Sequence, residues 1–283
     1  MKIYDTVPYF LNNYEPSIDF LRSYYEKYPD IFAEYFDSHC KDTDERHSES
    51  IKKYSQHFTV IKKVHENILP IIEEIAEEYR KLYQITFPVD INLIVGGFGS
   101  NAYTHHQIIP NITFALEKLS PDPDHLRVIV AHEFGHAAQN ILSDQVGIDW
   151  TKIQWTSPLI GLYQEGAATH LSRKTVVNVH PSIYFSYNDE GLEWLTFTHA
   201  NTSEIKKAFT ADYLSLTRDE LFHEWFSING GKTFGHSRLA YFIGDLFFQY
   251  EMNKLGEMAA IVAWKNKDFE EQVRQWLFQN DNE

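Results

Sequence analysis

Three residues in the stretch VIVAHEFGHAAQNIL, residues 128–142, have the types and spacing of a metal site with a base beside it. His132 and His136 are four positions apart, so on an α-helix both imidazoles lie on one face and can reach a single ion about 2 Å away. Glu133 lies about 100° around the helix from His132, where its carboxylate reaches a water molecule better than the ion. The spacing therefore predicts two metal ligands and one general base.

The elements around this motif favour a buried helix. The residues SPDPD at 120–124 are typical of a helix start, and only Gly135 interrupts the good helix formers that follow. Most neighbours are apolar, from Val128 to Ala137, and in such a setting two histidines and a carboxylate are costly without partners. Gly135 costs about 1 kcal/mol relative to alanine, which a close approach of a ligand or a neighbouring backbone would explain.

A catalytic zinc ion needs a third protein ligand and an open position for water. Glu165, in LYQEGAATHLS, is the first candidate because it lies on a second predicted helix over 157–174. Gly166 and the two alanines after it would let this helix pack closely on the first. We expect one zinc ion per chain with Glu165 as third ligand; the alternatives are His170, Asp144 and Asp149.

The N-terminal half changes from helical to strand patterning. Apolar residues at three- and four-residue spacing predict amphipathic helices within 15–38 and 50–84, and Pro70 should bend or divide the second. Alternation in 89–100 and a short apolar run in 111–119 predict two strands of a small sheet.

The remainder of the chain is expected to be mostly helical. This predicts an α+β protein, predominantly helical, with an N-terminal helical region over 1–85 packed on a catalytic domain over 86–283. Breaks are predicted near NVHPSIYF, SINGGKTFG and NKLGE.

The bulk composition excludes several classes of partner. With 25 basic and 40 acidic residues, the net charge of -15 disfavours nucleic acid and anionic lipid. The single cysteine, Cys40, excludes an intrachain disulfide and fits a reducing compartment. Neither a signal peptide nor an apolar run of about 18 residues is visible. We expect a soluble, cytoplasmic protein, unless a leader has been removed, and the sequence leaves its oligomeric state open.

The motifs HEFGH, QEGAATHL and RLAYFIGDLFF together resemble the gluzincin metallopeptidases. The chain is most similar, over roughly 89–255, to the bacterial family of zinc-dependent proteases of unknown function related to the gliding-motility lipoprotein GldB. The resemblance implies a zincin-like core with an active-site helix. It implies that His132, His136 and Glu165 bind zinc and that Glu133 is the general base.

The resemblance also implies a mechanism and further site residues. Zinc would lower the pKa of its bound water, Glu133 would take the proton as the water attacks a peptide carbonyl, and Glu133 would pass it to the leaving amine. Tyr241 is the first candidate for a donor to the oxyanion, followed by His236 and Arg238. By the same analogy, residues 111–117 would form an edge strand that binds substrate backbone.

Two departures from the family pattern bear on the site. Glu165 lies further from His136 than in thermolysin-like enzymes, and Thr169 occupies the position of their second-shell aspartate. Thr169 or Asn140 is expected to orient a ligand imidazole instead. The aminopeptidase signature GxMEN is absent from the sequence.

Other polar residues of the strand region are expected to have ordinary roles. Glu117 is predicted to be a solvated residue at a strand end. His105 and His106 are adjacent, so on a strand they would point to opposite faces, and a loop pair with surface roles is the preferred interpretation.

The sequence favours a zinc-dependent peptidase acting on a peptide or protein substrate. One alternative is a noncatalytic zincin-like protein used for binding or regulation, which would have no need of Glu133 as a base. Another is a zinc hydrolase of a non-peptide amide, which the sequence does not separate from a peptidase.

Overall fold

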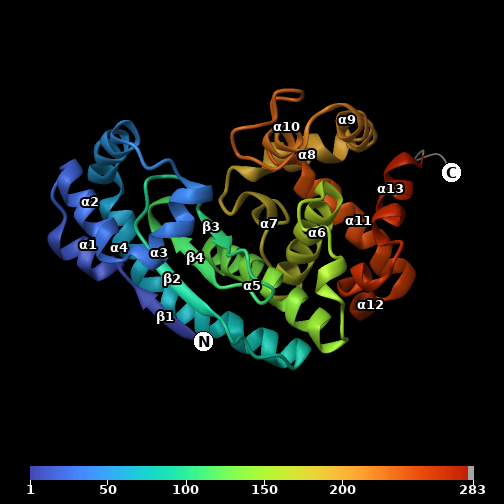
Figure 1. Ribbon diagram of the computed structural model, residues 1–283, viewed down its shortest axis with the longest axis horizontal. Coiled ribbons are helices and arrows are strands. Elements are labelled where there is room, and N and C mark those ends of the chain that lie inside the picture. The colour runs from blue at the N-terminus through green and yellow to red at the C-terminus, as the bar shows by residue number, and fades with distance from the viewer. Residues whose placement is uncertain (280–283) are drawn as a thin grey trace. The chain divides into compact units, whose positions relative to one another are not determined.

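The computed structural model describes residues 1–279. Figure 1 shows the path of the chain. The protein is 67% helical with a small four-stranded mixed sheet, which confirms the predicted α+β class. Contacts group the chain into two compact units, Met1–Ala137 and Ala138–Glu283. The division at residue 85 that was made from the sequence stays a prediction.

The first unit is built around the sheet. Its elements are β1 (Lys2–Asp5), α1 (Val7–Asn13), α2 (Ile18–Lys27), α3 (Pro29–Glu34), the π-helix η1 (Tyr35–His39), α4 (Asp44–Tyr83), β2 (Asp90–Ile94), β3 (Ala102–Thr104), β4 (Ile112–Ala115), the 3-10 helix η2 (Leu116–Lys118) and the first part of α5 (Pro123–Gln145).

The four strands follow the order β1-β2-β4-β3. β1 and β4 both pair with β2 in parallel, and β3 pairs with β4 in an antiparallel sense. The two predicted strands are present as β2 and β4, whereas β1 and β3 were not predicted. The expectation that residues 111–117 form an edge strand is wrong, because β4 lies between β2 and β3.

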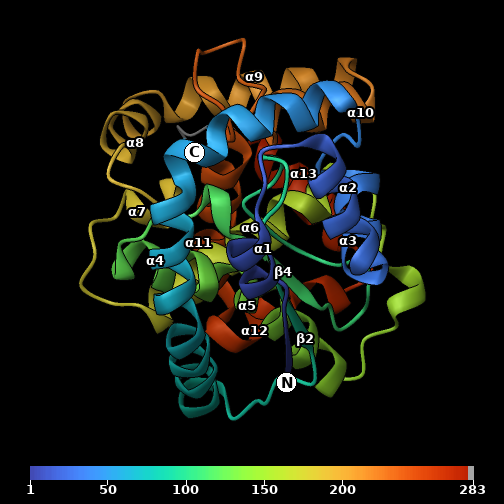
Figure 2. The same ribbon diagram turned by 90° about the vertical axis from the view of Figure 1, so that its left-hand side faces the viewer.

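α4 is one helix of 40 residues and is not divided at Pro70. Thr43 caps its start by accepting a hydrogen bond from the Arg46 backbone N–H, and Figure 2 shows the helix curving along its length. The exposed Pro70 removes one backbone donor, but it lies between Ile68 and Ile71, which are buried. Burial of this apolar stripe compensates for the lost hydrogen bond.

The second unit is helical throughout its regular structure, as predicted. It contains η3 (Trp150–Lys152), α6 (Pro158–Thr175), α7 (Ile183–Ser186), α8 (Gly191–Ala200), α9 (Thr202–Ser215), α10 (Arg218–Trp225), α11 (Leu239–Leu255), α12 (Glu257–Ile261), η4 (Ala263–Lys265) and α13 (Phe269–Phe278).

Two glycines let α6 and α11 approach each other at backbone distance. A Cβ on Gly166 would lie 2.1 Å from the Gly244 carbonyl oxygen, and one on Gly244 would lie 2.2 Å from the Leu162 carbonyl oxygen. The Arg173 guanidinium joins the same helices through two bonds to the Asp245 carboxylate, at 3.1 and 2.9 Å. Gly166 therefore packs on α11, and its packing on α5 stays a prediction.

Candidate metal centre

α5 is a core helix, as its apolar flanks predicted. From His125 to Ser143 its residues are buried, apart from Arg127 and His136, which are half-buried. The Tyr79 hydroxyl of α4 donates to the Ala131 carbonyl oxygen at 2.7 Å and so fixes the turn that precedes the motif. The polar motif residues thus occupy a helix that is held by packing on nearly all sides.

The motif histidines share one face of α5. His132 is 2% exposed, and its ring centroid lies 4.9 Å from that of His136, with the two planes at 88°. The four-residue spacing brings the two rings together, as expected for adjacent turns of one helix.

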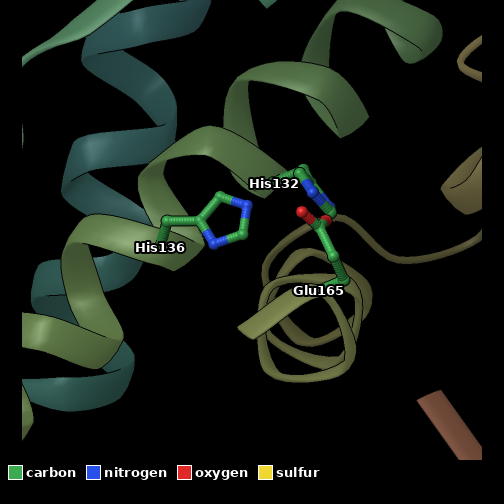
Figure 3. A group of neighbouring side chains, drawn as sticks. All are labelled: His132, His136 and Glu165. Atoms are coloured by element: carbon green, nitrogen blue, oxygen red, sulfur yellow. The ribbon is translucent and has the colours of Figure 1, made fainter. Parts of the chain in front are cut away.

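Glu165 joins the two histidines. It is a half-buried residue in the middle of α6, whose start is capped by Ser157 accepting a hydrogen bond from the Leu159 backbone N–H. One ligand atom from each of His132, His136 and Glu165 lies within 4.8 Å of the other two. Figure 3 shows the Glu165 carboxylate turned toward the histidine rings. The three residues form a group that could hold a metal ion.

The donor set of this group fits zinc. Two imidazole nitrogens and one carboxylate oxygen are ligands that zinc accepts, and three protein ligands leave a fourth position open. Bonds of about 2.0–2.2 Å place the ligand atoms of a tetrahedral ion about 3.4 Å apart. The observed limit of 4.8 Å leaves only small side-chain adjustments to reach this spacing.

The alternative third ligands have other partners. His170 Nε2 lies 2.8 Å from a Glu257 carboxylate oxygen, and its Nδ1 lies 3.3 Å from the Gln249 amide nitrogen. The Asp144 carboxylate accepts a hydrogen bond from the Trp150 indole, and Asp149 caps η3. Of the candidates considered from the sequence, Glu165 is the one in the group.

Glu133 lies next to His132 on α5 and is 7% exposed. Its role as a base stays a prediction. Thr169 is fully buried, and its hydroxyl has no hydrogen-bond partner within residues 1–279, so it does not orient an imidazole. The corresponding role of Asn140 stays a prediction.

The predicted oxyanion donors lie at the start of α11. Tyr241 is half-buried, and the Arg238 guanidinium lies 5.3 Å from its ring centroid. Arg238 also donates to the Phe185 carbonyl oxygen at 2.5 Å. His236 packs against Phe197, with ring centroids 4.2 Å apart. The catalytic roles of Tyr241 and His236 stay predictions.

The sequence placed two polar residues wrongly, His105 and Glu117. His105 was expected to have a surface role, but its side chain is 9% exposed, whereas that of His106 is 81% exposed. Glu117 is 1% exposed, and its carboxylate accepts hydrogen bonds from the backbone N–H groups of Gly96, at 2.8 Å, and Phe98, at 3.1 Å. Burial raises its pKa to about 7, although these hydrogen bonds oppose the shift. Its position after the buried run ITFA, together with the loop VGGFGS, was the available signal.

Fold and group together define a mostly helical α+β protein with a candidate metal centre. No family model, no curated protein and no solved structure matches this chain. Within the described part of the chain, no helix is long and apolar enough to cross a membrane.

Proposed function

We propose that this protein is a zinc-dependent peptidase of the gluzincin type, with a zincin-like core. The observation that carries the proposal is the grouping of His132, His136 and Glu165, with Glu133 directly beside a ligand in the sequence. A noncatalytic structural site usually closes zinc with four protein ligands, whereas two histidines and a glutamate are typical of catalytic zinc in peptidases.

Each residue of the group has a distinct part in the proposed reaction. His132, His136 and Glu165 would hold the ion, which when bound supplies Lewis acidity that polarises a carbonyl and acidifies water. Glu133 would accept the proton of the attacking water and deliver it to the leaving nitrogen. Tyr241, with His236 as second candidate, would donate a hydrogen bond to the oxyanion.

The position of Glu133 supports its assignment as the base. Glu133 directly follows the ligand His132 on α5 and is 7% exposed. A binding protein would need the ligands and not this carboxylate, so Glu133 separates the peptidase from the noncatalytic alternative.

The proposal is tested by peptide-library cleavage, read by mass spectrometry, with zinc content measured on the same samples. Wild type should cleave, Glu133→Gln should keep zinc and lose cleavage, and Asp124→Asn, at the exposed start of α5, should behave as wild type. If zinc-loaded wild type cleaves no peptide, the peptidase is overturned. Cleavage of non-peptide amides alone would assign a different hydrolase.

A further inference from the structure

Residues 34–40, here called the strap, are fastened to both ends of the short strand β3. Before β3, the Ser100 backbone N–H donates to the His39 carbonyl oxygen at 3.2 Å, and the Ser100 hydroxyl lies 3.1 Å from His39 Nδ1. After β3, the Glu34 carboxylate accepts from the His106 backbone N–H at 3.1 Å and lies 2.9 Å from His105 Nδ1. The two fastenings depend on different histidines.

His39 and Tyr35 of the strap also contact β3 and the loop before it. The His39 ring stacks on the Tyr103 ring, with centroids 3.6 Å apart and planes at 16°. The Tyr35 hydroxyl accepts from the backbone N–H groups of Gly97, at 2.8 Å, and Gly99, at 3.1 Å. A Cβ on Gly99 would lie 2.2 Å from the His39 carbonyl oxygen, so glycine is needed for this approach.

The backbone of the strap is of a rare kind. Tyr35–His39 is a π-helix, closed by a hydrogen bond from the Cys40 N–H to the Tyr35 carbonyl oxygen at 2.8 Å. π-turns are uncommon and concentrate where a local conformation serves a function. This π-helix positions the His39 ring against the Tyr103 ring.

His105 connects the strap to the interior of the sheet. Its Nε2 lies 2.8 Å from the Thr113 hydroxyl, which also accepts from the Asn92 amide at 3.1 Å. Both ring nitrogens of His105 are therefore engaged, one with Glu34 and one with Thr113. A change of charge on the His105 ring would therefore alter its contacts with both Glu34 and Thr113.

The two histidines favour the neutral state in the closed arrangement. Burial, and after it the charges of His106 and His105, lower the pKa of His39 to about 4, and Asp37 opposes the shift. Burial also lowers the pKa of His105, although Glu34 acts in the opposite direction. Two more titratable groups contact the neighbouring loop, residues 96–99. The Lys118 ammonium donates to the Gly99 carbonyl oxygen, and the Glu117 carboxylate accepts from the Gly96 backbone N–H.

We propose that residues 34–40 form an acid-released strap, which covers β3 when His39 is neutral and detaches from Ser100 and Tyr103 when His39 is protonated. The direction of the pH dependence follows from the lowered pKa of His39. The closed strap has its full stability above the ordinary histidine pKa of 6.5 and loses it as the pH falls toward about 4. From His39 alone, the opening equilibrium should rise about 30-fold between pH 8 and pH 5.

Hydrogen exchange at pH 8 and pH 5, corrected for the intrinsic pH dependence of amide exchange, tests the strap. Peptides covering 30–40 and 98–106 in wild type should show the roughly 30-fold increase in opening at pH 5. His39→Gln, which cannot take up a proton, should reduce that increase to less than about three-fold. His223→Gln, an exposed histidine of α10, should leave it unchanged.

Equal opening at the two pH values in wild type would overturn the proposal, as would an unchanged response in His39→Gln. If that variant does not fold, NMR titration of the wild-type histidines still decides the question. His39 must titrate well below 6.5, and its transition must coincide with chemical-shift changes at Ser100 and Tyr103. Titration at 6.5 or above, or without those changes, would contradict the strap.

Discussion

Two regions of this protein combine histidine with glutamate, and they use the combination differently. On α5, His132 and His136 are four apart and face Glu165, so that ligand atoms of three residues converge. After β3, the adjacent His105 and His106 diverge, with side chains 9% and 81% exposed. There Glu34 and Thr113 engage both nitrogens of His105. Spacing, more than residue type, separates the metal group from the strap.

Glu133→Gln should have the largest effect, and it tests the proposed catalytic role of the region around the metal group. Loss of the base should lower cleavage about 10²–10⁴-fold while zinc content stays at one per chain. Steady-state cleavage and metal analysis of the same preparation measure the two quantities. Unchanged cleavage would remove Glu133 from the mechanism.

Gly244→Ala tests how the metal group is held. The new Cβ would lie 2.2 Å from the Leu162 carbonyl oxygen and 3.1 Å from the Gly166 nitrogen, so α6 and Glu165 must shift. We expect the free energy of unfolding to fall by about 3 kcal/mol and zinc affinity to fall about 10-fold.

Gly161→Ala is the matched control on α6. Its Cβ would meet the Phe226 and Phe222 rings at ordinary distances of 3.4 to 3.5 Å, so stability and zinc affinity should stay near wild type. Denaturant unfolding and competitive zinc titration provide the two readings. If the two alanine variants have the same stability and the same zinc affinity, the contact between α6 and α11 does not position Glu165.

Glu117→Gln probes the carboxylate of the sheet region. Because burial raises the pKa from 4.5 to about 7, the contribution of Glu117 to stability is complete below 4.5 and is lost as the pH rises through 7. Relative to wild type, the variant should gain about 2–3 kcal/mol of unfolding free energy between pH 5 and pH 8. A constant difference across this range, measured by denaturant unfolding, would refute the shift.

His105→Gln should have the smallest effect, and it tests the region after β3, where His105 contacts Glu34 and Thr113. The variant weakens the bonds to Glu34 and Thr113, which should cost about 1–2 kcal/mol of unfolding free energy. Zinc content should remain one per chain, because His105 is not in the metal group. Loss of zinc in this variant would mean that the two regions are not separate.

Local sequence patterns predicted the metal region well. The spacing of His132 and His136 depends on one helix only, and Glu165 was found because glutamate in QEGAATH completes a known ligand set. The contact of Gly166 with α11 was not predicted, since a small residue indicates close approach without indicating the neighbour.

The sheet region was predicted less well, for a physical reason. β1 and β3 have four and three residues, too few for an alternating pattern, and strand order depends on pairing between segments far apart in the chain. Glu117 follows a strand, where a charged residue is usually solvated, and only its contact with the 96–99 loop explains its burial.

The central claim, that His132, His136 and Glu165 bind one zinc ion, is tested most directly by metal analysis of the purified protein and its single alanine variants. Wild type and the control His170→Ala should carry about one zinc per chain, His132→Ala and His136→Ala close to none, and Glu165→Ala clearly less than wild type. Full zinc retention in both His132→Ala and His136→Ala would contradict the account.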